Sequence, residues 1–239
     1  MNSAPERLIE HFQAEGYHPR SDKHSNALCR FVLADMLDRC PPLRAHAARR
    51  EVVCSLNHTI HAGPIQWNVD MVIGPPGVSA LVEDLNDGIA VEAPATVRIA
   101  LEVKSIMTEH GKARKNRLRD FDSLHTYVHR AETAAVAASL LVINISDRFK
   151  SPLRQGTLGH HNISSIVKET VSMFKSLPMR SKTEGEGLEA LGIIIVDFDN
   201  IDFQSGKLFS RSPAPQVGDP THYDGFIRQI CNRYCERWE

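Results

Sequence analysis

The stretch from Ile99 to Phe121, IALEVKSIMTEHGKARKNRLRDF, decides the fold expected for this chain of 239 residues. Its first half alternates like a β-strand, in which residues two apart share a face. One face is apolar and is formed by Val97, Ile99, Leu101 and Val103. The other face carries Glu102 and Lys104, beside the small Ala100. A charged pair at this place in a strand points to chemistry rather than to packing.

The second half of the stretch predicts a basic helix over about 113–131. Its basic residues, together with the lysine just before it, are Lys112, Arg114, Lys115, Arg117 and Arg119. At 100° per residue, Lys112, Lys115 and Arg119 lie opposite the apolar arc, where they could meet a phosphate backbone. Arg117 falls inside that arc. Either it stands at a frayed helix start, or it is buried toward the catalytic edge and pairs there with a carboxylate or phosphate.

A second strand, expected over 65–74, carries the other candidate carboxylate. Val69, Met71 and Ile73 are predicted to form an apolar row, which leaves Asn68 and Asp70 on the opposite face. If this strand pairs with the strand that holds Glu102, the side chain of Asp70 can meet Glu102 beside the ammonium group of Lys104.

Two converging carboxylates repel each other unless a counter-charge joins them. Mg²⁺ prefers oxygen ligands and keeps several waters, so Asp70, Glu102 and the backbone carbonyl of Val103 form a suitable ligand set, with Mn²⁺ as a substitute. Lys104 would position or deprotonate an attacking water and offset charge on the phosphorus. These residues therefore predict hydrolytic phosphodiester cleavage driven by electrostatics and positioning.

The arrangement of Asp70 and Glu102-Val103-Lys104 on two strands, followed by a helix and a core strand, resembles the PD-(D/E)xK nuclease superfamily. That superfamily includes many restriction endonucleases, Holliday-junction resolvases and phage-defence nucleases. The resemblance covers roughly residues 25–150. It implies a restriction endonuclease-like α/β fold, a mixed sheet flanked by helices, with the metal on Asp70 and Glu102 and an assisting Lys104.

The chain departs from the family pattern in two places. Val69 stands where the family's proline would be, and an acidic excursion separates Asp70 from Glu102 by 32 positions. Many members add an acidic residue from the first helix. Asp35, Asp38 or Glu51 could serve here, and the sequence selects none of them.

The remainder of the chain completes a single expected domain, 1–239, in which 151–239 finishes the sheet and contributes to DNA binding or dimerisation. Helices are expected over 5–14, 25–40, 162–177 and about 222–238, and further strands over 51–63, 136–146 and 191–203. Pro41-Pro42 should end the second helix. Candidate DNA-facing segments are 206–221 and 148–161, the latter with Arg148, Lys150 and Arg154.

Composition limits the class of protein. Lys and Arg total 28 against 29 Asp and Glu, which excludes a uniformly basic coat but allows a local basic patch. No apolar run approaches a membrane span, and the five cysteines lack a Cys-x-x-Cys pair. We expect a cytoplasmic protein with reduced thiols.

Together these features predict a Mg²⁺-dependent DNA endonuclease, most simply a type II restriction enzyme or a related phage-defence nuclease. It would act on double-stranded DNA as a homodimer, since cutting both strands needs two sites. The alternatives are a structure-specific or signal-activated nuclease with the same core, and a catalytically silent nucleic-acid-binding module.

Overall fold

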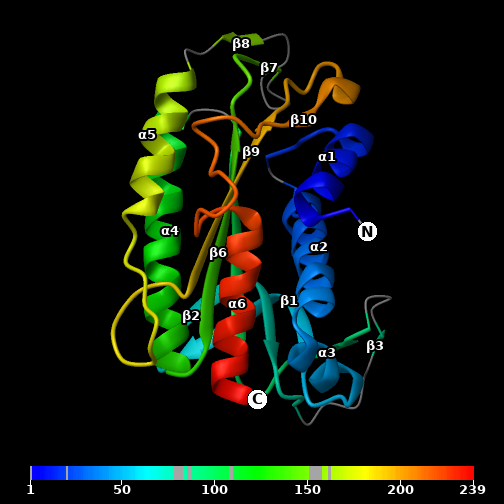
Figure 1. The fold of residues 1–239 in the computed structure, drawn as a ribbon, viewed down its shortest axis with the longest axis vertical. Helices are drawn as coiled ribbons and strands as arrows, with labels where there is room; N and C mark the ends of the chain where they lie inside the picture. The colour runs from blue at the N-terminus through cyan, green and yellow to red at the C-terminus, as the bar shows by residue number, and fades with distance from the viewer. Residues whose placement is uncertain are drawn as a thin grey trace.

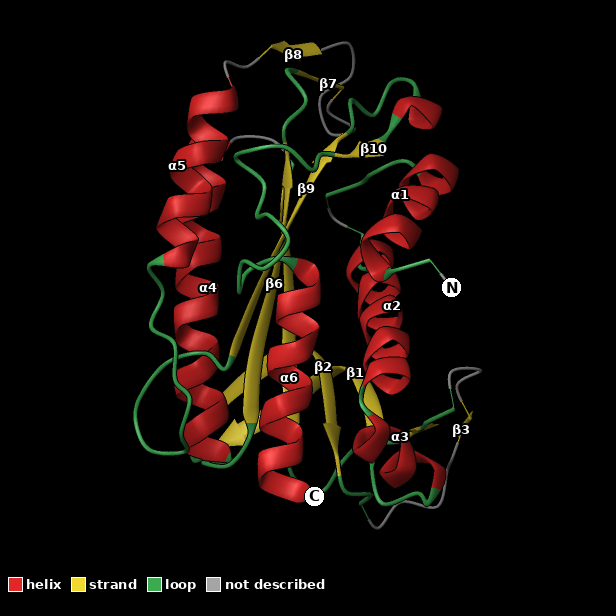
Figure 2. Ribbon diagram, viewed as in Figure 1, coloured by secondary structure: helices red, strands yellow, loops and turns green. Residues whose placement is uncertain are grey.

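An eight-stranded mixed sheet runs through the molecule, and helices cover both of its faces (Figures 1 and 2). The computed structural model describes residues 2–19, 21–77, 83–84, 88–107, 110–150, 158–160 and 163–239. The helices are α1 (Ala4–Glu15), α2 (Lys23–Arg39), α3 (Pro41–Ala48), α4 (His110–Ala131), α5 (Ile163–Lys175) and α6 (Tyr223–Trp238). The strands of the main sheet are β1 (Val53–Ala62), β2 (Ile65–Gly74), β3 (Glu83–Asp84), β4 (Ala90–Val91), β5 (Ile99–Ile106), β6 (Val136–Asn144), β9 (Ala190–Asp197) and β10 (Lys207–Leu208). The predicted α/β sandwich of one mixed sheet between helices is confirmed.

The strand order is β10-β9-β6-β5-β2-β1-β4-β3. β5, β6 and β9 are parallel to one another, whereas β2 runs antiparallel to both β5 and β1. Parallel neighbours need crossover connections, and α4 and α5 supply them between β5, β6 and β9. The sheet is therefore parallel on one side of β5 and antiparallel on the other.

Two hydrophobic clusters hold the helices against the sheet. One contains buried residues of α1, α2, α3 and α6, and the other contains those of α4 and α5. Figure 1 shows α4 and α5 on one side of the sheet, with α1, α2 and α6 on the other. β6 is buried along its whole length, as its continuous apolar sequence predicted.

Asn144, the last residue of β6, joins the end of its own strand to the residue that follows β9. Its side chain donates to the Phe198 carbonyl (2.8 Å) and accepts from the Phe198 and Ser146 N–H groups (both 3.1 Å). The buried His110 ring contacts the Asn144 carbonyl (2.8 Å) at the start of α4. The His110 contact fixes the start of α4 at the end of β6, the strand that pairs with the strand of Glu102.

Two helix boundaries differ from those expected. Pro41 does end α2, but it also opens α3 at the first helical position, where the missing N–H costs nothing. α4 begins at His110 rather than near residue 113. Arg117 therefore lies two turns inside the helix, and the frayed-end interpretation is wrong.

The predicted apolar row on β2 is only partly correct. Met71 and Ile73 belong to the cluster of α1, α2 and α6, but Val69 belongs to the cluster of α4 and α5. The strand therefore changes faces at Asp70. β5 keeps the expected alternation from Ile99 to Val103, which share the first cluster, while Val97 precedes the strand and packs in the second.

The segments named as DNA-facing fold in different ways. Arg148 and Lys150 lie on β7 (Arg148–Lys150), which pairs with β8 (Leu158–His160), and Arg148 bonds Asp199 at 3.0 Å. Arg154 lies outside the described residues. Residues 206–221 contain β10 and the loop that leads into α6. No helix within the described ranges is both long enough and apolar enough to span a bilayer.

Candidate active site

Asp70 lies where β2 separates from β5. The two strands pair from Ile73–Ile99 to Met71–Leu101, and continuing that register would set Val69 opposite Val103. Instead, the Val103 N–H donates to Asp70 Oδ2 at 2.8 Å. The carboxylate side chain thus takes the place of a backbone acceptor, because a backbone N–H withdrawn from water needs a partner.

Lys104 joins Asp70 to Glu102. Its Nζ lies 3.1 Å from Asp70 Oδ2 and forms an ion pair with Glu102 Oε1. The side chains of Glu102, Asp70 and Lys104 are 3%, 15% and 21% exposed, so the cluster is largely withdrawn from solvent. The structure brings together the three residues that the sequence named as catalytic.

The electrostatics of the cluster are unbalanced. Burial and the nearby Asp70 raise the pKa of Glu102 to about 7, and Lys104 offsets this only in part. Burial opposes the charged form of Lys104, but Glu102 and Asp70 outweigh it and raise the pKa of Lys104. One ammonium group therefore serves two carboxylates, and Glu102 Oε2 is buried with no hydrogen-bond partner among the described residues.

These groups fit a hard divalent cation. Carboxylate and carbonyl oxygens are the ligands that Mg²⁺ accepts, and the unpartnered Glu102 Oε2 is an available one. In a β-strand, the N–H and C=O groups of one residue point toward the same neighbouring strand. Because the Val103 N–H points to Asp70, the Val103 carbonyl also lies on the side of β5 that faces Asp70. Across the described ranges, no group of three or more His, Cys, Asp or Glu side chains could hold a metal, so further ligands would be backbone or water.

Asp35 does not join this site. Its Oδ2 accepts from the Ala4 N–H (2.8 Å) and the Tyr223 hydroxyl (2.6 Å), and its Oδ1 pairs with Arg7. The carboxylate ties α1 and α6 to α2. Its role in this structure is to hold three helices together.

Asp38 and Glu51, the other two acidic candidates, are exposed. Glu51 forms an ion pair with Arg49 at 2.8 Å. Neither meets Asp70 or Glu102, since no larger acidic cluster occurs in the described part of the chain.

The basic residues of α4 divide into two groups. Lys112, Lys115 and Arg119 are exposed, as the helical projection predicted. Arg114 instead pairs with Glu169 of α5 at 2.9 Å, so it links two neighbouring helices. Of these four residues, three face solvent and one pairs with the neighbouring helix.

Arg117 has a different partner from the one expected. Its Nη1 bonds Asp120 Oδ2 at 3.1 Å one turn along the helix, and its side chain is 39% exposed. The expectation that it pairs with an active-site carboxylate is wrong. Its charge nevertheless acts on Tyr17, whose pKa is raised by burial and moderated by Ser105 and Arg117.

Several neighbours of the site could not be found from the sequence. Tyr17 bonds Ser105 at 2.8 Å, and Tyr17, His24 and Ser25 line a pocket of about 40 Å³ together with Lys104. Cys29 of α2 is buried, and burial together with Asp70 raises the pKa of its thiol. Nothing in the sequence spacing associates these residues with Glu102, because the fold alone brings α2 and the preceding loop to this edge.

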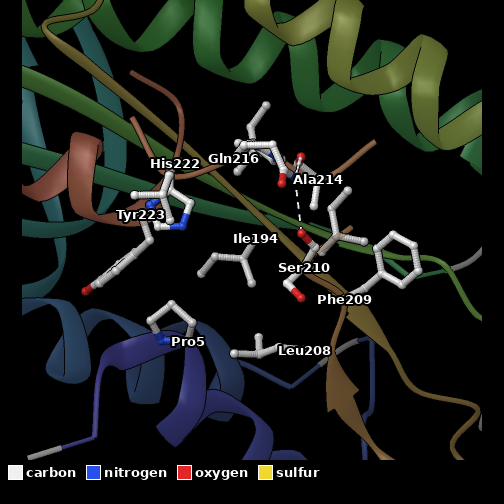
Figure 3. Close-up of a pocket in the computed structure, with 13 residues that line it drawn as sticks. Pro5, Ile194, Leu208, Phe209, Ser210, Ala214, Gln216, His222 and Tyr223 are labelled. Atoms are coloured by element: carbon white, nitrogen blue, oxygen red, sulfur yellow. Dashed lines mark hydrogen bonds between the residues drawn. The ribbon is translucent and has the colours of Figure 1, made fainter. Parts of the chain in front are cut away.

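Another pocket, of about 160 Å³, lies between α1, β9, β10 and the loop before α6 (Figure 3). Its described lining residues include aliphatic side chains, His222 and Tyr223, but no carboxylate, lysine or arginine. Gln216 closes one side by donating to the Ser210 carbonyl at 3.1 Å. This pocket lacks the charged groups that phosphodiester chemistry needs, so we place the candidate site at Asp70, Glu102 and Lys104.

In comparisons with known proteins, no family model, no curated protein and no solved structure matches the chain.

Proposed function

We propose that this chain is a Mg²⁺-dependent DNA endonuclease of restriction endonuclease-like fold, either a type II restriction enzyme or a related cytoplasmic phage-defence nuclease. One observation carries the proposal. Two carboxylates on neighbouring strands share a single lysine, and the more buried carboxylate, Glu102, keeps an oxygen without a hydrogen-bond partner among the described residues. Such a surplus of buried negative charge is unfavourable unless a cation binds there.

Asp70, Glu102 and the Val103 carbonyl would hold the cation. Bound there, Mg²⁺ or Mn²⁺ would polarise a phosphate oxygen and lower the pKa of a water. Asp70 is already oriented by the Val103 N–H, so it needs little rearrangement to bind. Such preorganisation is where electrostatic catalysis gains most of its rate.

Lys104 acts as a charged donor in this proposal. Because its pKa is raised, its Nζ is an ammonium group at neutral pH and cannot remove a proton from water. It can donate a hydrogen bond to the attacking water or to a phosphate oxygen as negative charge develops. This favours positioning and charge stabilisation over the general-base role that the sequence left open.

The exposed cations of α4 supply the DNA contact in the proposal. Lys112, Lys115 and Arg119 lie on the helix that directly follows the strand of Glu102 and Lys104. Contacts of this kind to phosphates give affinity without sequence specificity. Cleavage of both strands of a duplex would require two copies of the chain, so we propose a homodimer on DNA.

The test is cleavage of a supercoiled plasmid and of long duplex DNA by the purified chain, with Mg²⁺ and with a chelator. We expect nicked or linear products with Mg²⁺ only, and none from Asp70→Asn. Asp38→Asn, which changes an exposed carboxylate outside the cluster, is the matched control and should cut like the wild type. Equal cleavage by Asp70→Asn and wild type would show that the assigned site is wrong.

A further inference from the structure

Asn57 has an unusual backbone for the middle of a strand. It lies in β1 with φ of 50°, in the left-handed region that costs most non-glycine residues energy. The other described non-glycine residues with positive φ, Arg50 and Asn200, lie outside strands. Conformations of this kind persist only where the surrounding structure imposes them, and they concentrate at functional sites.

Asn57 stands opposite Asp70. β1 and β2 pair at Leu56–Met71 and again at His58–Val69, and the position between these pairs is the one occupied by Asn57 and Asp70. The register is the same on both sides of the gap, so neither strand gains a residue. The interruption is therefore a local change in backbone direction and not a bulge with an extra residue.

Both strands change faces at this level. On β1, Leu56 packs with the cluster of α1, α2 and α6, whereas Ile60 belongs to the cluster of α4 and α5. On β2, Met71 and Val69 divide between the same two clusters. Regular alternation would have kept each pair on one face. The left-handed residue supplies the backbone rotation that this exchange needs.

The rotated segment is also attached to α2. The Asn57 side chain donates to Asn26 Oδ1 at 3.0 Å. α2 is the helix that places Ser25 and Cys29 beside the carboxylate cluster. The kink in β1 is thus held from the same element that packs over the site.

We infer that Asn57 is a positioning residue for Asp70: its left-handed backbone turns β2 away from β5, which brings the Asp70 carboxylate onto the Val103 N–H and beside Lys104. The importance of this geometry for metal binding rests on the proposed function. The geometric part does not, because the Val103–Asp70 bond can be followed without metal or DNA.

Substitutions at Asn57 separate conformation from side chain. Glycine adopts positive φ at no steric cost, so Asn57→Gly should keep the kink. Valine is excluded from that region, so Asn57→Val should force β1 back toward regular pairing. Arg50→Val places the same strain outside the strand, and Thr59→Val exchanges one β-branched residue for another at an ordinary exposed position of β1.

The experiment measures hydrogen exchange of the Val103 amide by NMR, relative to a core amide such as Leu140, together with Mn²⁺ affinity. In Asn57→Val we expect Val103 exchange to rise at least about tenfold, as in Asp70→Ala. Mn²⁺ affinity should fall about tenfold or more, the usual loss when a group that orients a ligand is removed. Asn57→Gly should restore both values to within about threefold of wild type. Arg50→Val and Thr59→Val should leave both unchanged.

The outcomes are distinct. Unaltered Val103 exchange in folded Asn57→Val would overturn the inference, whatever the chain does to DNA. If Asn57→Val does not fold, Asn57→Ala, whose methyl group opposes positive φ less strongly than the valine side chain, must show the same changes at smaller size. If Val103 exchanges faster in Asn57→Val but the wild type neither binds Mn²⁺ nor cuts DNA, the positioning role is upheld and the proposed function is rejected.

Discussion

Lys104 is the residue whose role is most easily separated from metal binding. Its ammonium group pairs with both carboxylates, so removing that group should free their oxygens for a cation. The Mn²⁺ affinity should then equal or exceed that of the wild type. Its loss should lower the single-turnover cleavage rate about 100-fold or more, as for other preorganised donors. Lys104→Met, tested by calorimetry and by quenched single-turnover cleavage, checks both. If Lys104→Met loses Mn²⁺ binding as well as cleavage, the role assigned to Lys104 is contradicted.

Glu102 should make the metal-free protein less stable at high pH. Burial raises its pKa to about 7, so between about pH 4.5 and 7 the folded chain binds a proton that the unfolded chain lacks. Stability is therefore lost as pH rises through this window. Glu102→Gln should be more stable than wild type at pH 8, by on the order of 1–3 kcal/mol, with little difference near pH 4.

Denaturant unfolding of both proteins in chelator, at pH 4 and pH 8, measures this effect. Lys104 keeps Asp70 as a partner in the variant, which limits the loss from the broken ion pair. A Glu102→Gln protein that is less stable than wild type at pH 8 would show that the ion pair outweighs burial.

At the residue scale, the sequence was sufficient to predict that Asp70, Glu102 and Lys104 lie together, because strand alternation is local. Asp70, Glu102 and Lys104 follow from a period of two and from the pairing of neighbouring strands. The face exchange at Asp70 could not be predicted, because it depends on the backbone conformation of Asn57. The partner of Arg117 was missed although it is local: Asp120 lies one helical turn away and pairs with the guanidinium group in place of an active-site carboxylate.

At the scale of elements, a buried ion network joins α4, β9 and α6. Glu189 is fully buried and accepts from Arg180 (2.6 Å), Arg237 (2.9 Å), the Ala137 N–H (2.8 Å) and the His129 ring (3.2 Å). Burial raises its pKa, but the partners, His129 foremost, outweigh burial and lower the pKa of Glu189. Ionised Glu189 therefore stabilises the fold at pH values above the ordinary carboxyl pKa. This stabilisation is lost as the pH falls through the lowered pKa of Glu189.

Glu189→Ala should destabilise the fold by about 3–5 kcal/mol at pH 7, because it leaves two buried guanidinium groups without their carboxylate. Thermal and denaturant unfolding measure the loss. Glu184→Ala, at an exposed position of the preceding loop, is the matched control and should change stability by less than about 0.5 kcal/mol. Similar stability of the two variants would mean that the network contributes nothing.

The exposed face of α4 should govern DNA affinity and not the chemical step. Replacing Lys112, Lys115 and Arg119 together by glutamine should weaken DNA binding and reduce the slope of log affinity against log salt by about 2–3, one per lost phosphate contact. Lys182→Gln, in an exposed loop, should leave both unchanged. Anisotropy titrations over a salt series measure the slope, and an unaltered slope would remove α4 from the DNA interface.

The elements themselves were mostly predictable, for reasons that differ between them. β6 is apolar throughout and lies buried between parallel neighbours, so its sequence pattern and its environment agree. α3 was missed because Pro41 ends one helix and opens the next, two effects that look alike in a sequence. The two-residue strands β3, β4 and β10 carry no periodicity that could be recognised.

At the scale of the whole molecule, the sheet arrangement explains why the site lies where it does. β5 is the strand at which the sheet changes from parallel to antiparallel pairing; Glu102 lies on this strand and Asp70 on its antiparallel neighbour β2. α4, with its exposed cations, covers one side of the sheet, and α2, with Ser25 near Lys104, covers the other (Figure 1). The described residues form one such carboxylate–lysine cluster per chain, so the proposed double-strand cut would need two copies of the chain.

The central claim is that Asp70 and Glu102 hold a divalent cation, and a Mn²⁺ titration of the purified chain by isothermal calorimetry tests it most directly. We expect one bound ion per chain for the wild type and for Asp38→Asn, and an affinity about tenfold or more weaker in both Asp70→Asn and Glu102→Gln, because each removes a ligand charge. Absence of binding by the folded wild type, or equal binding by Asp70→Asn, would contradict it.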